Sequence, residues 1–325
     1  MIPRNATPAL LLLAAAFIPL LASNEYYVNV SSQVIMYALL ALSLNILVGF
    51  GGMTSLGHAA FLGISAYVCA WLVTAMGWSA AAAAATSLLA GTAVAAFFGA
   101  LSLRVSGLSF LMITLAFGQI VWGIAYRWVS ITNGDNGLKI PARPTIFGYS
   151  IASANSFYYF SLIVLAIAVY AIWRLSNSSF GAVLRGTRDQ PRRMRMLGHN
   201  VLMIRWIAFV LSGFWGSVAG LLYLYYNQFV SPYAVSLQQS AETLLMVLLG
   251  GANTLIGPII GAIVITLVKI ILSSYMDRWY SVLGVIFILA VVYMPEGLVP
   301  GFSALLARWK GKRTATSTAP VAVLK

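Results

Sequence analysis

The acidic side chains of this chain are few, and their positions limit the chemistry that the chain can perform. None is expected in the middle of a long apolar segment; all six are placed at segment ends or in loops: Glu25, Asp135, Asp189, Glu242, Asp277 and Glu296. An ion- or proton-driven carrier usually holds an ionisable group inside the membrane, because a charge there is costly and is retained for use. The pattern therefore argues against such a carrier. His58 is the one titratable candidate near the expected core, and the alternative for it is a neutral side chain packed among small residues.

Motifs for enzymatic chemistry are missing from the sequence. It holds no G-x-x-x-x-G-K-[ST] phosphate-binding loop, no H-E-x-x-H zinc motif and no G-x-S-x-G nucleophile turn. The single cysteine, Cys69, lies in an apolar segment and is expected to be a small buried side chain, not part of a disulfide or metal-thiolate cluster. We therefore expect no enzymatic activity, no metal site and no cofactor.

The densest charged stretch runs from Ser178 to Asn200, between two long apolar segments. Ser178 or Ser179 can cap a helical turn over residues 180–188, and Asp189 can cap a second turn that begins near Pro191. Gly198 suits the position that ends this second turn. Five arginines fall within eleven residues of the stretch: Arg185, Arg188, Arg192, Arg193 and Arg195.

The second turn would carry an apolar face. Pro191, Met194 and Leu197 recur every three residues and therefore share one side of a helix. A short amphipathic helix with an apolar knob, held between two membrane spans, is suited to docking a partner. The alternative is a solvated basic loop that only fixes the orientation of the chain in the membrane. The periodicity favours neither.

The composition identifies the class of protein that positions these residues. Hydrophobic residues make up 61% of the chain and charged residues only 8%, whereas soluble domains have about a quarter of their residues charged. A chain of this composition is expected to be a polytopic membrane protein. The net charge of +13 follows from the scarcity of acids and the gathering of bases in particular loops, so it does not indicate nucleic acid binding.

The apolar segments predict an all-α membrane domain of about ten spanning or half-spanning helices. Residues 9–22 form either a signal peptide or a first span. Residues 34–73 and 242–272 are each long enough to cross or dip twice, with breaks near 49–57 and 250–257. Single spans are expected at 79–102, 107–129, 157–174, 204–226 and 279–294. Residues 131–156 form the main loop on the side opposite the arginine-rich stretch.

The distribution of basic residues predicts the orientation. Most of the 19 Lys and Arg residues fall on one side if both termini and the 176–203 loop are cytoplasmic. We therefore expect a transmembrane domain over residues 1–306 that includes this cytoplasmic loop, and a basic, disordered tail over 307–325.

The two glycine-rich breaks are similar to each other and lie about 200 residues apart. Similar interruptions in two halves of a membrane protein can mark an internal repeat with a site at its interface. Close packing of helices is the alternative, because small residues are common at such contacts. The residues concerned are Gly51, Gly52 and Gly57 in the first break and Gly250, Gly251 and Gly257 in the second.

An ordered set of motifs resembles the permeases of branched-chain amino acid ABC importers. The set covers about residues 34–298, and the NGDNG turn and the MPEGL ending look more like the LivM-type than the LivH-type subunit. The motifs are ALSLNILVG at 41–49, GMTSLGHAAFLG at 52–63, TLAFG at 114–118, NGDNG at 133–137, FGAVLRGTRD at 180–189 and MPEGL at 294–298.

The resemblance implies a transport subunit without ATPase activity of its own. In such importers the permease pairs with a second, LivH-type permease in the bacterial inner membrane. Two cytoplasmic ATPases drive the pair, and a periplasmic binding protein delivers the amino acid. Transport would proceed by alternating access. The contact loop for the ATPases would include Phe180, Gly181, Leu184, Arg185, Arg188, Asp189, Met194, Leu197 and Gly198. Residues 190–193 (QPRR) depart from the more acidic family pattern, which leaves the choice of ATPase partner open.

The resemblance leaves the substrate open, because this family also serves urea, short amides and other amino acids. A pathway for dipolar substrates needs hydrogen-bonding groups without fixed charge. Candidates by polarity and position are Asn45, Ser55, His58, Thr114 and Gln119; for each, a role in packing is the alternative. Two other classes remain: an ion-coupled secondary carrier, and a membrane scaffold or receptor whose basic loop binds lipid or a regulator.

Overall fold

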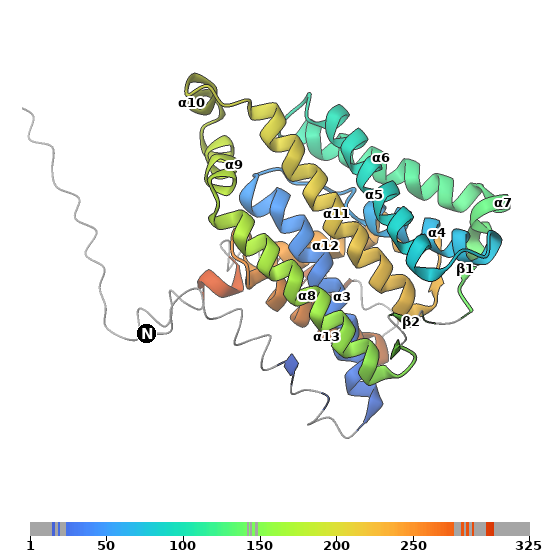
Figure 1. The fold of residues 1–325 in the computed structure, drawn as a ribbon. Helices are drawn as coiled ribbons and strands as arrows, with labels where there is room; N and C mark the ends of the chain where they lie inside the picture. The colour runs from blue at the N-terminus through green and yellow to red at the C-terminus, as the bar shows by residue number, and fades with distance from the viewer. Residues whose placement is uncertain are drawn as a thin grey trace, which may run out of the picture.

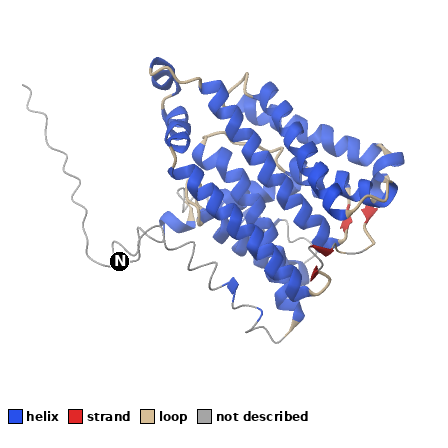
Figure 2. Ribbon diagram, viewed as in Figure 1, coloured by secondary structure: helices blue, strands red, loops and turns tan. Residues whose placement is uncertain are grey.

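The computed structural model describes residues 24–141, 143, 145–146, 149–275 and 297–301, together with a few isolated positions near the two ends. Within these residues the regular secondary structure is helical apart from two very short two-stranded sheets (Figure 2). The spans predicted at 9–22 and 279–294 lie mostly outside the described residues, and the tail at 307–325 lies wholly outside them.

The helix α3 (Glu25–Asn45) forms the centre of the fold. Asn24 caps its first turn by accepting a hydrogen bond from the Tyr26 N–H, and every residue from Ile35 to Asn45 is buried. α3 packs against α8 (Ala154–Asn177), α11 (Val201–Asn227), α12 (Leu237–Gly250) and α13 (Gly257–Tyr275) (Figure 1). A helix that is apolar all round is stable only when it is surrounded in this way.

A second group of helices lies on the other side of α11. It consists of α4 (Ala59–Ala75), α5 (Ala80–Ser102) and α6 (Leu108–Arg127). α4 and α5 both pack on α11, which therefore joins the two groups (Figure 1). Large apolar side chains of α5, α6 and α8 are exposed, as expected of surfaces that face lipid or a partner in the membrane.

Short elements close the end of the molecule opposite α9 (Ser179–Asp189). They are α7 (Val129–Thr132), η2 (Gly134–Asn136) and η3 (Pro232–Val235). β1 (Leu138–Lys139) pairs antiparallel with β4 (Phe229–Val230), with Leu138 opposite Val230. β2 (Thr145–Ile146) pairs with β3 (Tyr149–Ser150). The β1–β4 pair joins the loop after α6 to the segment after α11.

Six of the described helices are long and apolar enough to cross a membrane, and α4 is a shorter apolar helix. The chain is therefore a multi-pass membrane protein. The count of about ten and the cytoplasmic position of both termini stay predictions.

The predicted breaks within the two long apolar stretches are confirmed. α3 continues as one π-helical turn, η1 (Ile46–Phe50), and the chain is then non-helical until α4 begins at Ala59. The second stretch divides into α12 and α13, which lie antiparallel. Gly250 and Gly261 allow this approach, because a Cβ at Gly250 would collide with the Gly257 carbonyl and one at Gly261 with the Met246 carbonyl.

The expected position of Glu242 at a segment end is wrong. The helix α12 begins at Leu237, where Ser236 caps it, so the polar run before Glu242 forms its first turns. The carboxylate is buried against α13 and lies 2.8 Å from the ammonium group of Lys269. This chain therefore holds a buried acid, so an ion-driven carrier is not excluded by the lack of one.

Candidate functional site

The arginine-rich stretch folds as two short helices at one end of the bundle, α9 and α10 (Pro191–Met196) (Figure 1). Ser178 caps α9 by accepting from the Gly181 N–H, and Gly198 adopts a φ of +85° after α10, both as predicted. The predicted cap by Asp189 is wrong. Gln190 occupies the cap position without a side-chain hydrogen bond, and Asp189 instead accepts from Arg188 at 2.8 Å.

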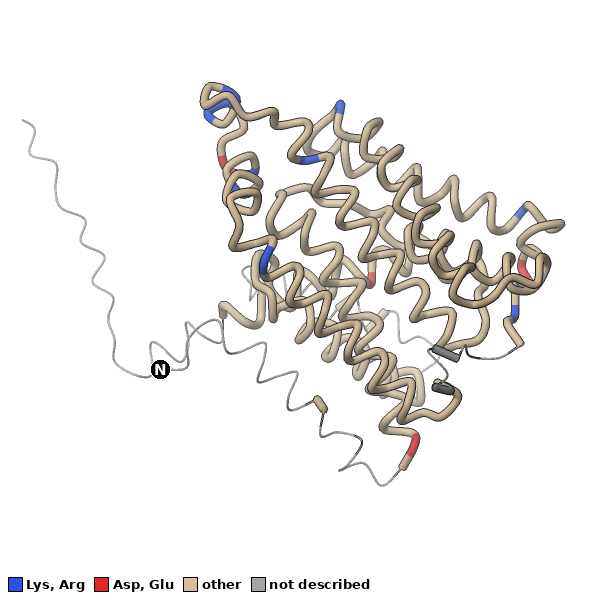
Figure 3. Tube along the Cα trace, in the orientation of Figure 1, with Lys and Arg blue, Asp and Glu red and all other residues tan. Residues whose placement is uncertain are grey.

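The apolar residues predicted to share one face of α10 lie in two different environments, one packed and one exposed. Met194 packs against Gly186 of α9, whereas Leu197 is 66% exposed. Met196, which the three-residue spacing did not include, is 88% exposed. We call Met196 and Leu197 the apolar knob. Arginines of α10 are exposed beside it, and the basic segments of both helices gather at this end (Figure 3).

Several contacts fix α9 to the membrane helices. Leu184 is almost fully buried, and Gly181 lies directly on the last turn of α8, where a Cβ would collide with backbone carbonyls. Arg185 donates to the Ser176 carbonyl at 2.8 Å. Arg205 of α11 donates to the Thr187 carbonyl at 2.6 Å. Phe180 is half-buried against the core. The helix is therefore part of the packed body, and a solvated loop does not describe it.

Arg188 connects α9 with the first glycine break. Its Nη1 donates to the Gly49 carbonyl at 2.7 Å, across 139 residues of sequence. Its aliphatic stem lies against Gly52, which has a φ of +65° and no space for a Cβ. A basic side chain from the arginine-rich stretch thus contacts the backbone where α3 ends.

The two glycine breaks lie against each other, and Asn45 joins them. Its Nδ2 donates to the Thr254 carbonyl at 2.8 Å, and its Oδ1 accepts from the Asn253 N–H at 3.2 Å. Gly49 packs on the Asn253 backbone in a space that a Cβ would fill. Close packing is therefore observed at both breaks, while the internal repeat stays a prediction.

The other residues predicted for a pathway are held by separate local contacts among the described residues. The Nε2 of His58 lies 2.7 Å from the Ser43 hydroxyl, and the ring is fully buried. Thr114 donates to the Leu111 carbonyl of its own helix. Ser55 is buried beside Gly57, and Gln119 is half-exposed on α6. Their role in a pathway stays a prediction.

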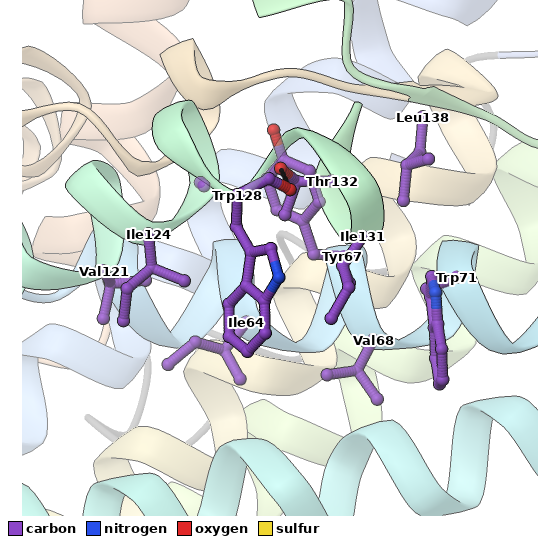
Figure 4. A pocket seen from close by; sticks show the side chains of 11 residues that line it. Ile64, Tyr67, Val68, Trp71, Val121, Ile124, Trp128, Ile131, Thr132 and Leu138 are labelled. Carbon is purple, nitrogen blue, oxygen red and sulfur yellow. Dashed lines mark hydrogen bonds between the residues drawn. The ribbon is translucent and has the colours of Figure 1, made fainter. Parts of the chain in front are cut away.

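A cavity of about 190 Å³ lies between α4 and α6, beneath α7 (Figure 4). Its walls are aliphatic and aromatic, with Trp128 and Trp71 among them, and none of the predicted pathway residues lines it. Among the described residues no three His, Cys, Asp or Glu side chains gather as metal ligands.

Comparisons with known proteins find permeases of transport systems. The chain is 27% identical to the high-affinity branched-chain amino acid transport system permease protein LivM of Salmonella typhimurium, over an alignment of 315 positions that covers 90% of this chain and 74% of that protein. The LivM protein of Escherichia coli is 28% identical, with the same coverage. The autoinducer 2 import system permease protein LsrC of Salmonella typhi is 25% identical over 86% of this chain and 81% of its own.

No solved structure matches the chain. The family model for the permease component of branched-chain amino acid transport systems matches residues 26–292, which is most of the sequence. The chain therefore belongs to this family of transport permeases.

Proposed function

We propose that the chain is a LivM-type permease subunit of an ABC importer that moves branched-chain amino acids across the bacterial inner membrane. The names of the LivM relatives support this substrate class, and their match covers more of the chain than that of LsrC. Urea or short amides remain the alternative substrates within the family. An ion-coupled carrier is disfavoured by family membership.

The observation that carries the proposal is the contact of Arg188 with Gly49. It connects an exposed basic helix pair to a helix break inside the membrane domain. Asn45 continues the connection from the first break to the second. A movement imposed on α9 and α10 would therefore reach α3, α12 and α13 together.

In the proposed mechanism one of the two cytoplasmic ATPases docks on the α9–α10 segment. The apolar knob would enter a groove on one ATPase, and the exposed arginines around it would contact acidic groups at the rim. ATP binding would close the ATPase dimer, move α9 and reopen the spans on the other side. A LivH-type permease would complete the membrane domain, and a periplasmic binding protein would deliver the amino acid.

The test separates docking from transmission of the movement. Met196→Asp combined with Leu197→Asp places two charges in the docking surface, so the ATPases should no longer co-purify and leucine uptake should be lost. The swap of Met196→Leu with Leu197→Met keeps the apolar surface and should retain both. Arg188→Ala lies away from the knob, so the ATPases should still co-purify while uptake falls at least about tenfold, the equivalent of one lost charged hydrogen bond.

Two results would contradict the proposal. One is that no ATPase co-purifies with the native chain from mildly solubilised membranes that contain all the subunits. The other is that the aspartate variant transports leucine at the native rate.

A further inference from the structure

The Glu242–Lys269 ion pair takes no part in the contacts that connect α9 with the two glycine breaks. Its two atoms, Glu242 Oε2 and Lys269 Nζ, are 2.8 Å apart, and the side chains are 3% and 17% exposed. The pair joins α12 to α13 within the membrane domain. Moving two charged groups out of water costs free energy that two apolar side chains at the same positions would not cost. A buried ion pair in a membrane protein therefore points to a function.

Polar atoms around the pair lack partners. Both amide atoms of Gln239, the second carboxylate oxygen of Glu242 and the Thr266 hydroxyl are buried and make no hydrogen bond within the part of the chain that the structure describes. Gln239 and Glu242 are three residues apart on α12, as are Thr266 and Lys269 on α13, so each couple shares one helix face. Four such atoms in one cluster are unusual, since most buried polar atoms in proteins are paired.

Two tyrosines flank the lysine. The rings of Tyr37 and Tyr233 lie 5.9 and 5.8 Å from Lys269 Nζ. Tyr233 belongs to η3, at the end of the molecule opposite α9, and is 41% exposed. The cluster is therefore bordered by one exposed side chain at the end of the molecule that a periplasmic binding protein would meet under the proposed orientation.

The groups of the cluster complement an α-amino acid in its zwitterionic form. The ammonium group of Lys269, the Gln239 amide N–H groups and the Thr266 hydroxyl can donate to a carboxylate. The Glu242 carboxylate and the Gln239 carbonyl oxygen can accept from an α-ammonium group. Urea and simple amides carry no full charges. If they entered between Glu242 and Lys269, they could not compensate for the lost attraction between these two side chains.

We propose that Gln239, Glu242, Thr266 and Lys269 bind the α-ammonium and α-carboxylate groups of the transported amino acid. This inference rests on the proposed function, which it sharpens by naming a recognition site for zwitterions. The amino acid enters between the two charges, so one direct ion pair is replaced by two. The flexible four-carbon stem of Lys269 allows this separation, and the unpartnered atoms gain hydrogen bonds.

The deciding experiment compares two threonines that differ in one respect. Thr243 and Thr266 are both fully buried on facing helices of the hairpin. The Thr243 hydroxyl donates to the Gln239 carbonyl of its own helix at 2.8 Å, whereas the Thr266 hydroxyl has no partner among the described residues. Changing each to valine removes one hydroxyl with almost no change in shape.

The complete importer, with both permeases, the ATPases and the binding protein, is reconstituted in proteoliposomes. Leucine uptake per ATP hydrolysed and the thermal stability of the complex are measured for the native protein and for Thr266→Val, Thr243→Val and Glu242→Gln. Thr266→Val should keep or raise the stability and lower leucine per ATP about tenfold, as expected for loss of a hydrogen bond to a charged group. Thr243→Val should lower the stability slightly and leave leucine per ATP unchanged. Glu242→Gln should lower the leucine uptake per ATP at least as much as Thr266→Val does.

The outcomes distinguish this inference from the proposed function. If the native importer moves no amino acid at the expense of ATP, the proposed function fails and the inference fails with it. If the native importer transports leucine and both Thr266→Val and Glu242→Gln do so equally well, the inference alone is overturned and the pair only joins α12 to α13. A loss of transport that follows the loss of thermal stability across all three variants also overturns it.

Discussion

Two buried polar regions of this permease differ in how their hydrogen bonds are satisfied. Where the glycine breaks meet, Asn45 uses both its amide oxygen and its amide nitrogen on backbone groups of residues 253 and 254, and Arg188 pairs with the Gly49 carbonyl. The second region lies between the halves of α12 and α13 that are far from their connecting turn. Here the Gln239 side chain makes no hydrogen bond within the described chain, although it is as deeply buried as Asn45. The first arrangement specifies one packing of the backbone, whereas the second leaves donors and acceptors available to a ligand.

The largest effect should come from breaking the satisfied region at Asn45. Asn45→Leu has nearly the native volume, but it removes the partner of the Asn253 N–H and of the Thr254 carbonyl at a part-buried contact. We expect a loss of roughly 2–4 kcal/mol in stability, at about 1–2 kcal/mol for each group. Thermal unfolding of the purified complex, followed by size-exclusion chromatography, measures the change. Native stability in this variant would mean that the contact between the breaks is incidental.

A smaller loss should follow a change in backbone spacing within the same region. Gly250→Ala places a methyl group against the Gly257 carbonyl, which cannot move without separating α12 from α13. Overpacking of this kind costs about 1–3 kcal/mol. Gly123→Ala on α6 is the matched control, because a Cβ there meets nothing within 4 Å. The same thermal assay should therefore register a change only for Gly250→Ala, and equal behaviour of the two variants would contradict the prediction.

The smallest change in stability is expected at Gln239. Gln239→Met keeps the length of the side chain and removes an amide that has no described partner, so stability should stay within about 0.5 kcal/mol of native or rise. The comparison with Asn45→Leu is direct, since both variants replace a buried amide by an apolar group. A destabilisation at Gln239 as large as that at Asn45 would remove the distinction between the two regions.

Much of the membrane layout could be predicted from the sequence. The span expected at 79–102 is α5 at Ala80–Ser102, and the break expected near 250–257 separates α12 from α13. These predictions succeeded because they depend on segment length and on glycine, both of which are local properties. The cap at Ser178 is local in the same way.

The features that the sequence could not predict depend on contacts between distant parts of the chain. Glu242 follows a run of polar residues, so it resembled the edge of a loop, and its partner Lys269 lies 27 residues further on. The polarity of Asn45 favours a role in the pathway, which stays a prediction, whereas its contacts with residues 253 and 254 could not be predicted because these lie more than 200 residues away. Met196 was missed because the apolar spacing selected Met194, and that side chain turned out to pack on α9.

The attachment of α9 at both of its ends has a mechanical consequence. Its first turn is fixed to α8 through Gly181, and its last turn is fixed through Arg188 to η1, the turn that continues α3. An eleven-residue helix is about 16 Å long and bends little over that distance. A displacement of α10 would therefore move the end of α3 by a comparable amount, because α9 is too short to absorb the displacement by bending.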